Sequence, residues 1–485
     1  MTWKESISPF LSRIPAVRRP IKHVPFRQKM IWTLLVLVVY FYLTNVTIYG
    51  LGGNAQDIFG QFRSILAGEQ GSILQLGIGP IVTASIVLQL LAGADLLGLD
   101  TSDPADQVIY QGLQKFLVIL MVILTGFPMV FAGGFLPADP FVSTQLGVSL
   151  NTVRWIVFAQ IFAGGIFILY MDEVVSKWGI GSGVGLFIVA SVSQHLVGGI
   201  FTLGSDTQPS GLIPTWIGMA IGNVQVSPLF SGGFQELLFG QGNILALFTT
   251  LLIFGLVVYC ESVRVEIPLS HSKVRGAKGR FPVKLIYASV LPMILVRAVQ
   301  ANIQFLGRIL DSQMKNMPSW LGVYSSNEPV GGFFYYLNPI MSPGDWMWWL
   351  GQTAAEPWQI LLRVSTDLFI MVIGGAIFAI FWVETTNMGP ASTAQQIQRS
   401  GMQIPGFRRN PAVLEKVMQR YIPLVTVVGG ALVGFLAVGA NMLGTIGAVG
   451  GTGLLLTVSI VYKLYEEIAE EQLMEMHPMM RQMFG

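Results

Sequence analysis

The chain alternates between long apolar runs and shorter polar segments that are rich in Gly, Pro and charged residues. A helix needs about 20 apolar residues to cross the roughly 30 Å hydrocarbon core of a membrane. Ten runs approach that length and predict ten transmembrane helices, at residues 30–51, 72–93, 113–133, 153–175, 183–203, 244–262, 285–308, 361–384, 421–440 and 445–463. The pattern predicts an all-α polytopic membrane protein.

The second apolar run differs from the others because it opens with Gly77, Gly79 and Pro80. Proline is tolerated in the first helical turn, where its missing N–H would be unsatisfied anyway. A helix is therefore predicted to begin inside the hydrophobic zone. Broken helices at membrane depth occur only where they line a cavity or are buried in protein. We predict that this run lines a pore or a binding site rather than facing lipid.

Composition supports the membrane assignment and excludes several chemistries. The 485 residues are 52% hydrophobic and 11% charged, against about 25% charged in ordinary soluble domains. A single cysteine, Cys260, excludes an internal disulfide and a cysteine metal cluster. The chain has no Gly-Lys pair for a phosphate-binding loop, and its four histidines lack metal-ligand spacing. We therefore predict no cofactor and no enzymatic activity.

The distribution of charge predicts the orientation. Most of the 28 Lys and Arg residues lie between alternate pairs of spans, whereas Arg63 and Lys315 lie on the other side. By the positive-inside rule, both termini are then cytoplasmic. Segment 204–243 has no Lys or Arg and separates the spans into two sets of five. Because five is odd, the two halves would be inverted, an arrangement that commonly holds a transport path.

This reasoning divides the chain into five parts. They are a cytoplasmic segment 1–29, an N-terminal half 30–203, an external hinge loop 204–243, a C-terminal half 244–463 and a cytoplasmic tail 464–485. Within the spans, Arg297 is the one central charge, and Asp367 lies nearer an outer end. Charges inside a membrane are functional candidates by default. From sequence, Arg297 could snorkel, pair with Asp367 or contact pore water.

Six ordered motifs, spread over the whole set of spans, resemble one family. They are GIGPIVTAS (77–85), GSGVGLFI (181–188), ESVRVEIPL (261–269), QANIQFLG (300–307), GMQIPGFR (401–408) and GGTGLLLTVSIVYKLYE (450–466). The chain resembles SecY, the central subunit of the Sec protein-translocation channel, in its archaeal form. The resemblance implies two inverted halves of five spans around an hourglass pore.

The resemblance also implies which residues would close that pore. A ring of aliphatic side chains would seal the waist, formed by Ile78, Val82, Val184, Ile188, Ile294 and Leu456. Residues 78 and 82, like 184 and 188, are spaced so that each pair lies on one helix face. An apolar constriction resists water and ions by dewetting and offers no polar anchor to any one substrate. The residues alone favour ordinary core aliphatics at these six positions, and it is the resemblance that favours the ring.

The resemblance also implies roles for two further regions. Segment 58–67 resembles the plug helix, with plug residues Ile58, Phe59, Phe62, Arg63, Ile65 and Leu66. The second and seventh spans resemble a lateral gate, with polar gate residues Thr83, Gln89, Gln300 and Asn302. Hydrogen bonds between membrane helices average about 0.6 kcal/mol, which suits a gate that must open. An ordinary outer loop helix and ordinary interhelical contacts remain alternative roles.

Two basic loops resemble ribosome-docking loops. Their candidate residues are Lys273, Arg275, Lys278, Arg280, Arg408 and Arg409. Lys and Arg on ordered loops suit a phosphate surface such as ribosomal RNA, although topology alone also explains their sign. The family implies a heterotrimer with SecE and a small SecG/Sec-beta-type subunit, with nascent polypeptides, signal sequences, membrane lipid, SecD and SecF as further partners. The expected function is a protein-conducting channel of the cytoplasmic membrane; a small-solute transporter with inverted repeats is the alternative.

Overall fold

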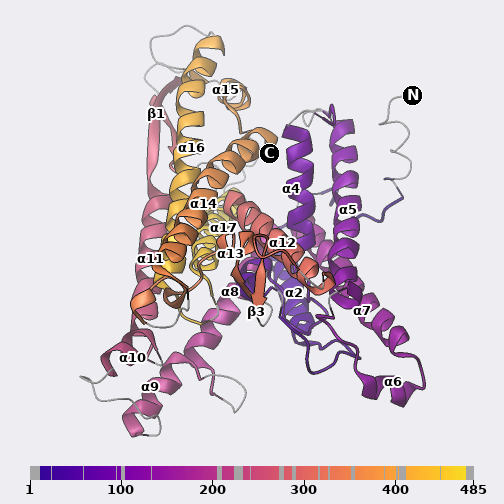
Figure 1. Ribbon diagram of the computed structural model, residues 1–485. Helices are drawn as coiled ribbons and strands as arrows, with labels where there is room; N and C mark the ends of the chain where they lie inside the picture. The colour runs from indigo at the N-terminus through magenta and orange to yellow at the C-terminus, as the bar shows by residue number, and fades with distance from the viewer. Residues whose placement is uncertain are drawn as a thin grey trace.

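The fold is a bundle of long helices with two small sheets, seen in a computed structural model (Figure 1). The structure describes residues 11–476 with gaps at 12, 23, 58, 94–95, 100–103, 133, 205–209, 223–232, 241, 272–277, 287–290, 315–316, 326–327, 351–354, 387, 400–401, 404–410 and 448.

Ten helices account for the ten predicted spans. They are α2 (Phe26–Asn45), α4 (Gly79–Gly93), α5 (Pro104–Phe127), α7 (Leu150–Trp178), α8 (Gly183–Phe201), α11 (Ile244–Ser262), α12 (Leu291–Gln313), α14 (Pro357–Thr385), α16 (Pro411–Leu443) and α17 (Gly451–Met476). Within the described residues, eight helices are long and apolar enough to cross a membrane. One of these eight combines α11 with the short helix α10 (Gly233–Phe239) that precedes it. The mostly helical membrane fold is thereby confirmed.

The other two helices, α4 and α17, depart from the simple pattern. Helix α4 has 15 residues and begins at Gly79, as the glycines and Pro80 predicted, and the residues before it form turns. Gly77 adopts φ +54°, a left-handed conformation that glycine adopts without strain. Helix α17 starts apolar at Gly451 and ends in an acidic stretch beyond Lys463. Both helices are largely buried inside the bundle along their apolar parts.

Two predicted loops contain regular structure that the apolar pattern did not predict. The predicted hinge loop 204–243 contains two short helices, α9 (Leu212–Ile221) and α10. The first basic loop is a hairpin of β1 (Arg264–His271) and β2 (Lys278–Lys284). Strand β5 (Met402–Gln403), in the second basic loop, pairs with β1 through Ser270 and His271. The two candidate docking loops therefore belong to one sheet, in the order β2-β1-β5.

The remaining elements are short. They are η1 (Gly60–Phe62), α3 (Arg63–Leu66), the π-helical turn η2 (Pro128–Ala132), α6 (Pro140–Leu146), β3 (Val323–Ser325), β4 (Glu328–Gly331), α13 (Phe333–Tyr336), η4 (Pro343–Asp345), η5 (Trp348–Leu350) and α15 (Pro390–Arg399). Strands β3 and β4 form a small antiparallel sheet. In Figure 1, β1 and α15 lie at one end of the bundle, and α6, α9 and α10 lie at the other. The loops predicted to be cytoplasmic and external thus segregate to opposite ends.

A continuous apolar core runs through the middle of the bundle. It joins residues of α2, α4, α5, α7, α8, α11, α12, α14, α16 and α17, together with α3. The short helix α3 lies inside this core and contacts both α8 and α17. A segment without the length of a membrane span is therefore buried at the centre of the molecule.

Candidate pore, plug and gate

The six aliphatic residues predicted for the pore ring lie together in the central core. Ile78 immediately precedes α4, and the others come from α4, α8, α12 and α17. Five of the side chains are at most 4% exposed, and Val184 packs against them half-buried. The structure thus brings together residues that are separated by almost the whole length of the chain. All six belong to the same apolar core, as a ring of aliphatic side chains would require.

A cavity lies on each side of the pore ring. The first, of about 450 Å³, is lined by α2, α7, α8 and α17 and includes Leu186 and Ile460. The second, of about 420 Å³, includes Gly60 of η1, Gly450 just before α17, and the loop around Pro343. Helix α17 passes from the second cavity to the first, and Leu456 lies between the two. The two cavities lie towards opposite ends of the apolar part of α17, as an hourglass pore would require.

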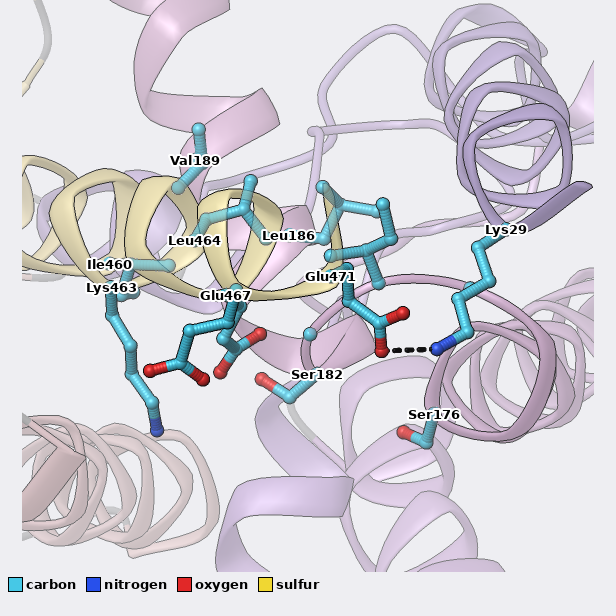
Figure 2. Close-up of a pocket in the computed structure, with 14 residues that line it drawn as sticks. Lys29, Ser176, Ser182, Leu186, Val189, Ile460, Lys463, Leu464, Glu467 and Glu471 are labelled. Atoms are coloured by element: carbon cyan, nitrogen blue, oxygen red, sulfur yellow. Dashed lines mark hydrogen bonds and ion pairs between the residues drawn. The ribbon is translucent and has the colours of Figure 1, made fainter. Parts of the chain in front are cut away.

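The first cavity is charged at its mouth (Figure 2). Lys29 of α2 forms an ion pair with Glu471 of α17, with 2.5 Å between Nζ and Oε1. Glu467 and Glu470 of α17 also line the cavity, as do Ser176 and Ser182. Figure 2 shows Glu467 on the same side of α17 as Glu471, which contacts Lys29. The cavity is therefore polar at its mouth and apolar towards the pore ring, where Leu186 and Ile460 lie.

The predicted plug lies on the opposite side of the ring. Phe59, Phe62, Ile65 and Leu66 are at most 6% exposed, whereas Ile58 lies outside the described residues. The Phe59 ring lies 5.5 Å from the Phe305 ring of α12, measured between centroids. The plug therefore contacts the gate helix α12 as well as the core around α8 and α17.

Arg63 is buried within the plug, which is unusual for a cation. Its guanidinium binds Asp57 in a bidentate contact, with 2.7 Å from Nε to Oδ2 and 2.5 Å from Nη2 to Oδ1. The Arg63 side chain is 7% exposed and the Asp57 side chain is 28% exposed. A buried charge is tolerated when it is paired and hydrogen-bonded. Asp57 therefore allows this arginine to remain in an apolar environment.

Close backbone contacts hold the plug against α4. The Ile78 N–H donates to the Leu66 carbonyl at 2.7 Å, and the Tyr40 hydroxyl donates to the Ala67 carbonyl at 3.0 Å. A Cβ atom on Gly77 would lie only 2.1 Å from the Leu66 carbonyl oxygen. Glycine at residue 77 is thus required both by its φ and by the space left to it. Ile78, a residue of the pore ring, bonds directly to the plug.

The four predicted gate residues divide into two groups. Asn302 of α12 donates to the Thr83 hydroxyl of α4 at 2.9 Å, which joins the two gate helices. Gln300 instead faces α14, where its amide donates to Asp367 at 3.1 Å. Gln89 is buried further along α4, beyond the Thr83–Asn302 contact. Of the four predicted gate residues, Thr83 and Asn302 therefore bond to each other across the two predicted gate helices.

Arg297 pairs with Asp367, which selects one of the three options that the sequence left open. The distance from Nη1 to Oδ1 is 2.8 Å, and Nη1 also donates to Gln300 at 2.7 Å. Arg297, Asp367 and Gln300 are 0%, 1% and 3% exposed. We call these three residues the buried triad. Spacing along the chain could not identify the partner, because 70 residues separate Arg297 from Asp367.

The structure describes only part of the predicted docking set. Lys278 and Arg280 lie on β2, opposite Ser270 and Pro268 of β1. Lys273, Arg275, Arg408 and Arg409 lie outside the described residues. The pairing of β1 with β5 nevertheless places both basic loops at one end of the bundle.

The fold defines a multi-spanning helical membrane protein with an apolar core and a cavity towards each end of it. The model of the SecY family matches residues 72–465, and the model described as the plug domain of Sec61p matches residues 38–71. The chain therefore belongs to the SecY family. This confirms the resemblance on which the ring, plug and gate predictions depend.

Curated relatives and solved structures agree over the whole length. A protein translocase subunit SecY of Haloferax volcanii is 68% identical and covers 100% of both chains. The same subunit of Archaeoglobus fulgidus is 50% identical and covers 99% of this chain and 98% of its own. A solved structure of a protein-conducting channel superposes with a TM-score of 0.79 at 37% identity, covering 97% of this chain and 98% of its own. Sec61 in a canine ribosome-channel complex gives a TM-score of 0.77 at 36% identity, with the same coverage.

Proposed function

We infer that this chain is the channel subunit of a protein translocase, which conducts polypeptides across a membrane. The observation that carries this inference is the continuous closure between two cavities, made by an apolar ring and a buried plug in a member of the SecY family. A polypeptide entering the charged cavity would meet the ring next. The ring excludes water and ions by dewetting, and it contacts a passing chain without selecting its sequence.

Opening requires two separate displacements. The plug must leave the ring, which breaks the Ile78–Leu66 and Tyr40–Ala67 hydrogen bonds. Release of an apolar segment into lipid requires α4 to separate from α12, which breaks the Thr83–Asn302 contact. A neutral hydrogen bond between membrane helices contributes about 0.6 kcal/mol on average. The seam between α4 and α12 is therefore suited to open and close reversibly.

The proposed partners follow from the two ends of the bundle. The sheet of β1, β2 and β5 collects the basic loops that suit ribosomal RNA, and we propose that it faces the cytoplasm together with both termini. The external end then holds α6, α9 and α10. SecE and a SecG/Sec-beta-type subunit would complete the heterotrimer, with SecD and SecF as further partners. Translation by a docked ribosome would supply the driving force.

A disulfide between the ring and a translocating chain tests this function. A Cys260→Ser variant with Val82→Cys is reconstituted with its partner subunits and a ribosome stalled on a secretory chain that carries one cysteine in its membrane-crossing part. Mild oxidation should join the two chains, and the yield should depend on nascent-chain length and on a functional signal sequence. The matched pair Ile188→Cys and Val197→Cys compares a ring residue with a 54%-exposed residue of the same helix. Crosslinking at Ile188 alone is expected.

The opposite result would exclude the channel. If neither Val82→Cys nor Ile188→Cys reacts while the ribosome is docked, polypeptide does not pass the ring. A small-solute transporter would then be tested by single-substrate flux across the same vesicles.

A further inference from the structure

Helix α12 has neighbours on two sides, and its contacts with them differ in kind. Towards α4, Asn302 bonds to the half-buried Thr83 as one neutral group to another. Towards α14, it presents Arg297 and Gln300 to Asp367, in a charged network that is almost fully buried. Removing one member of a buried ion pair leaves an uncompensated charge, which is strongly destabilising. The contact with α14 should therefore persist under conditions that break the contact with α4.

Steric packing strengthens the same side of α12. A Cβ atom on Gly375 of α14 would lie 2.2 Å from the Met293 side chain, and one on Gly374 would lie 3.1 Å from Val296. Small residues let helices approach closely in membranes. Helices α12 and α14 therefore pack in close contact next to the buried triad, where Met293 and Val296 precede Arg297 on α12.

The triad also reaches the external loop. The Ile340 N–H lies 3.4 Å from Asp367 Oδ2, and Arg363, one turn earlier on α14, donates to the carbonyls of Asn338 and Pro339 at 2.9 Å each. Asp367 thus connects α12, α14 and the segment that follows α13. Three pieces of the chain are held at one buried carboxylate.

We propose that the buried triad is a positioning device, which makes α12 move as one body with α14 and holds the ring residue Ile294 in place. Ile294 lies one turn before Arg297 on α12, so the position of the guanidinium sets the position of that ring side chain. By pairing with Arg297, Asp367 also keeps this charge out of the pore. Channel opening then moves α12 and α14 together relative to α4, which contacts both of them. This proposal rests on the proposed channel function.

A designed disulfide tests whether α12 and α14 move together. A Cβ atom on Gly374 would lie 3.8 Å from the Val296 Cβ, which matches the mean separation in disulfides. In the Cys260→Ser heterotrimer, oxidation of Val296→Cys with Gly374→Cys should leave translocation unchanged relative to the reduced form. Loss of translocation on oxidation would overturn the proposal.

The matched control joins the other side of α12. Thr83→Cys with Asn302→Cys, closed by a short bifunctional thiol reagent, should abolish lateral release of membrane segments. If release continues, α4 and α12 do not form the gate of the proposed function. That result differs from loss of translocation on joining α12 to α14, which contradicts only the role of the triad. The two crosslinks thus separate the two claims.

A charge variant tests the role of Asp367 at the ring. Asp367→Asn leaves Arg297 uncompensated one turn from Ile294, so we expect an anion-selective leak through the idle channel in planar bilayers. Adding Arg297→Met should remove the anion selectivity, because no fixed charge then remains. A merely structural contact would change protein yield without shifting the reversal potential. An unchanged reversal potential in Asp367→Asn, with channel present, would overturn the proposal.

Discussion

The two sides of the pore ring are closed by different kinds of contact. On the plug side, backbone atoms are in close contact. At Gly77, for example, no Cβ atom fits beside the Leu66 carbonyl. Each side also has a cavity, but only the one of about 450 Å³ away from the plug has charges such as Lys29 and Glu471 among its described lining residues. Under the proposed function, this difference predicts that the seal depends on the plug side and not on the charged cavity.

Gly77→Ala should have the largest effect on the seal. The new Cβ atom would overlap the Leu66 carbonyl oxygen at 2.1 Å, and a left-handed φ costs a non-glycine residue about 1–3 kcal/mol. The plug would be displaced from Ile78, and single-channel recordings should show a large rise in basal conductance. Gly79→Ala is the matched control, because its Cβ atom would meet only a Leu66 methyl group at 3.7 Å. Equal conductance in the two variants would contradict a tightly fitted plug.

Removing the ring side chains should have the next largest effect. Replacing Ile78, Val82, Ile188 and Ile294 by Gly widens the apolar waist and allows it to hydrate. We expect ion conductance in planar bilayers to rise, though less than in Gly77→Ala because the plug still covers the waist.

The control for the ring variant changes exposed residues on the same helices. The control replaces Leu90, Val197 and Leu306 by Gly. These three side chains are 41%, 54% and 53% exposed. This set carries a similar helix-propensity penalty, up to about 1 kcal/mol per glycine, but does not touch the waist. If the control leaks as much as the ring variant, the six aliphatics are ordinary core residues.

The transmembrane architecture could be predicted because hydrophobic runs and helix breakers are local signals. Gly77, Gly79 and Pro80 correctly placed the start of α4 inside the apolar zone. The strands were missed although a local signal existed. Arg264, Val265, Glu266 and Ile267 alternate polar and apolar with the period of a strand. The sign of the charge predicts on which side of the membrane the loop lies. Only the alternation of polar and apolar residues predicts the strand.

Local patterns did not predict the pairing of β1 with β5, and they offered the Arg297–Asp367 pair only as one of three options. The pairing of β1 with β5 joins Ser270 to Gln403, and the buried triad joins residues 70 positions apart. Similarly, Gln300 shares its helix with Asn302, yet the two face different neighbours. A residue two positions further along a helix points about 200° away. Assignment to a gate helix therefore did not assign the side chain to the gate.

Asp57→Asn should weaken the plug without changing its fit. It leaves Arg63 buried without its anion, and breaking a buried ion pair costs about 3–5 kcal/mol, with less expected here because Asp57 is partly exposed. Basal conductance should rise by less than in the ring variant. The double variant Asp57→Asn with Arg63→Met should restore closure, because no unpaired charge remains. A double variant that leaks more than Asp57→Asn would show that the guanidinium itself seals the pore.

Lys29→Gln should have the smallest effect, although its ion pair with Glu471 is as short as the Arg63–Asp57 contact, at 2.5 Å. Both side chains are about one-fifth exposed, and exposed pairs contribute at most about 1 kcal/mol, less in high salt. We expect unchanged basal conductance and a small loss of thermal stability that disappears as salt is raised. A rise in conductance comparable to that of Asp57→Asn would show that the charged mouth is part of the seal. The ion-pair distance does not distinguish Lys29–Glu471 from Arg63–Asp57. The two pairs differ in whether water can replace the lost partner.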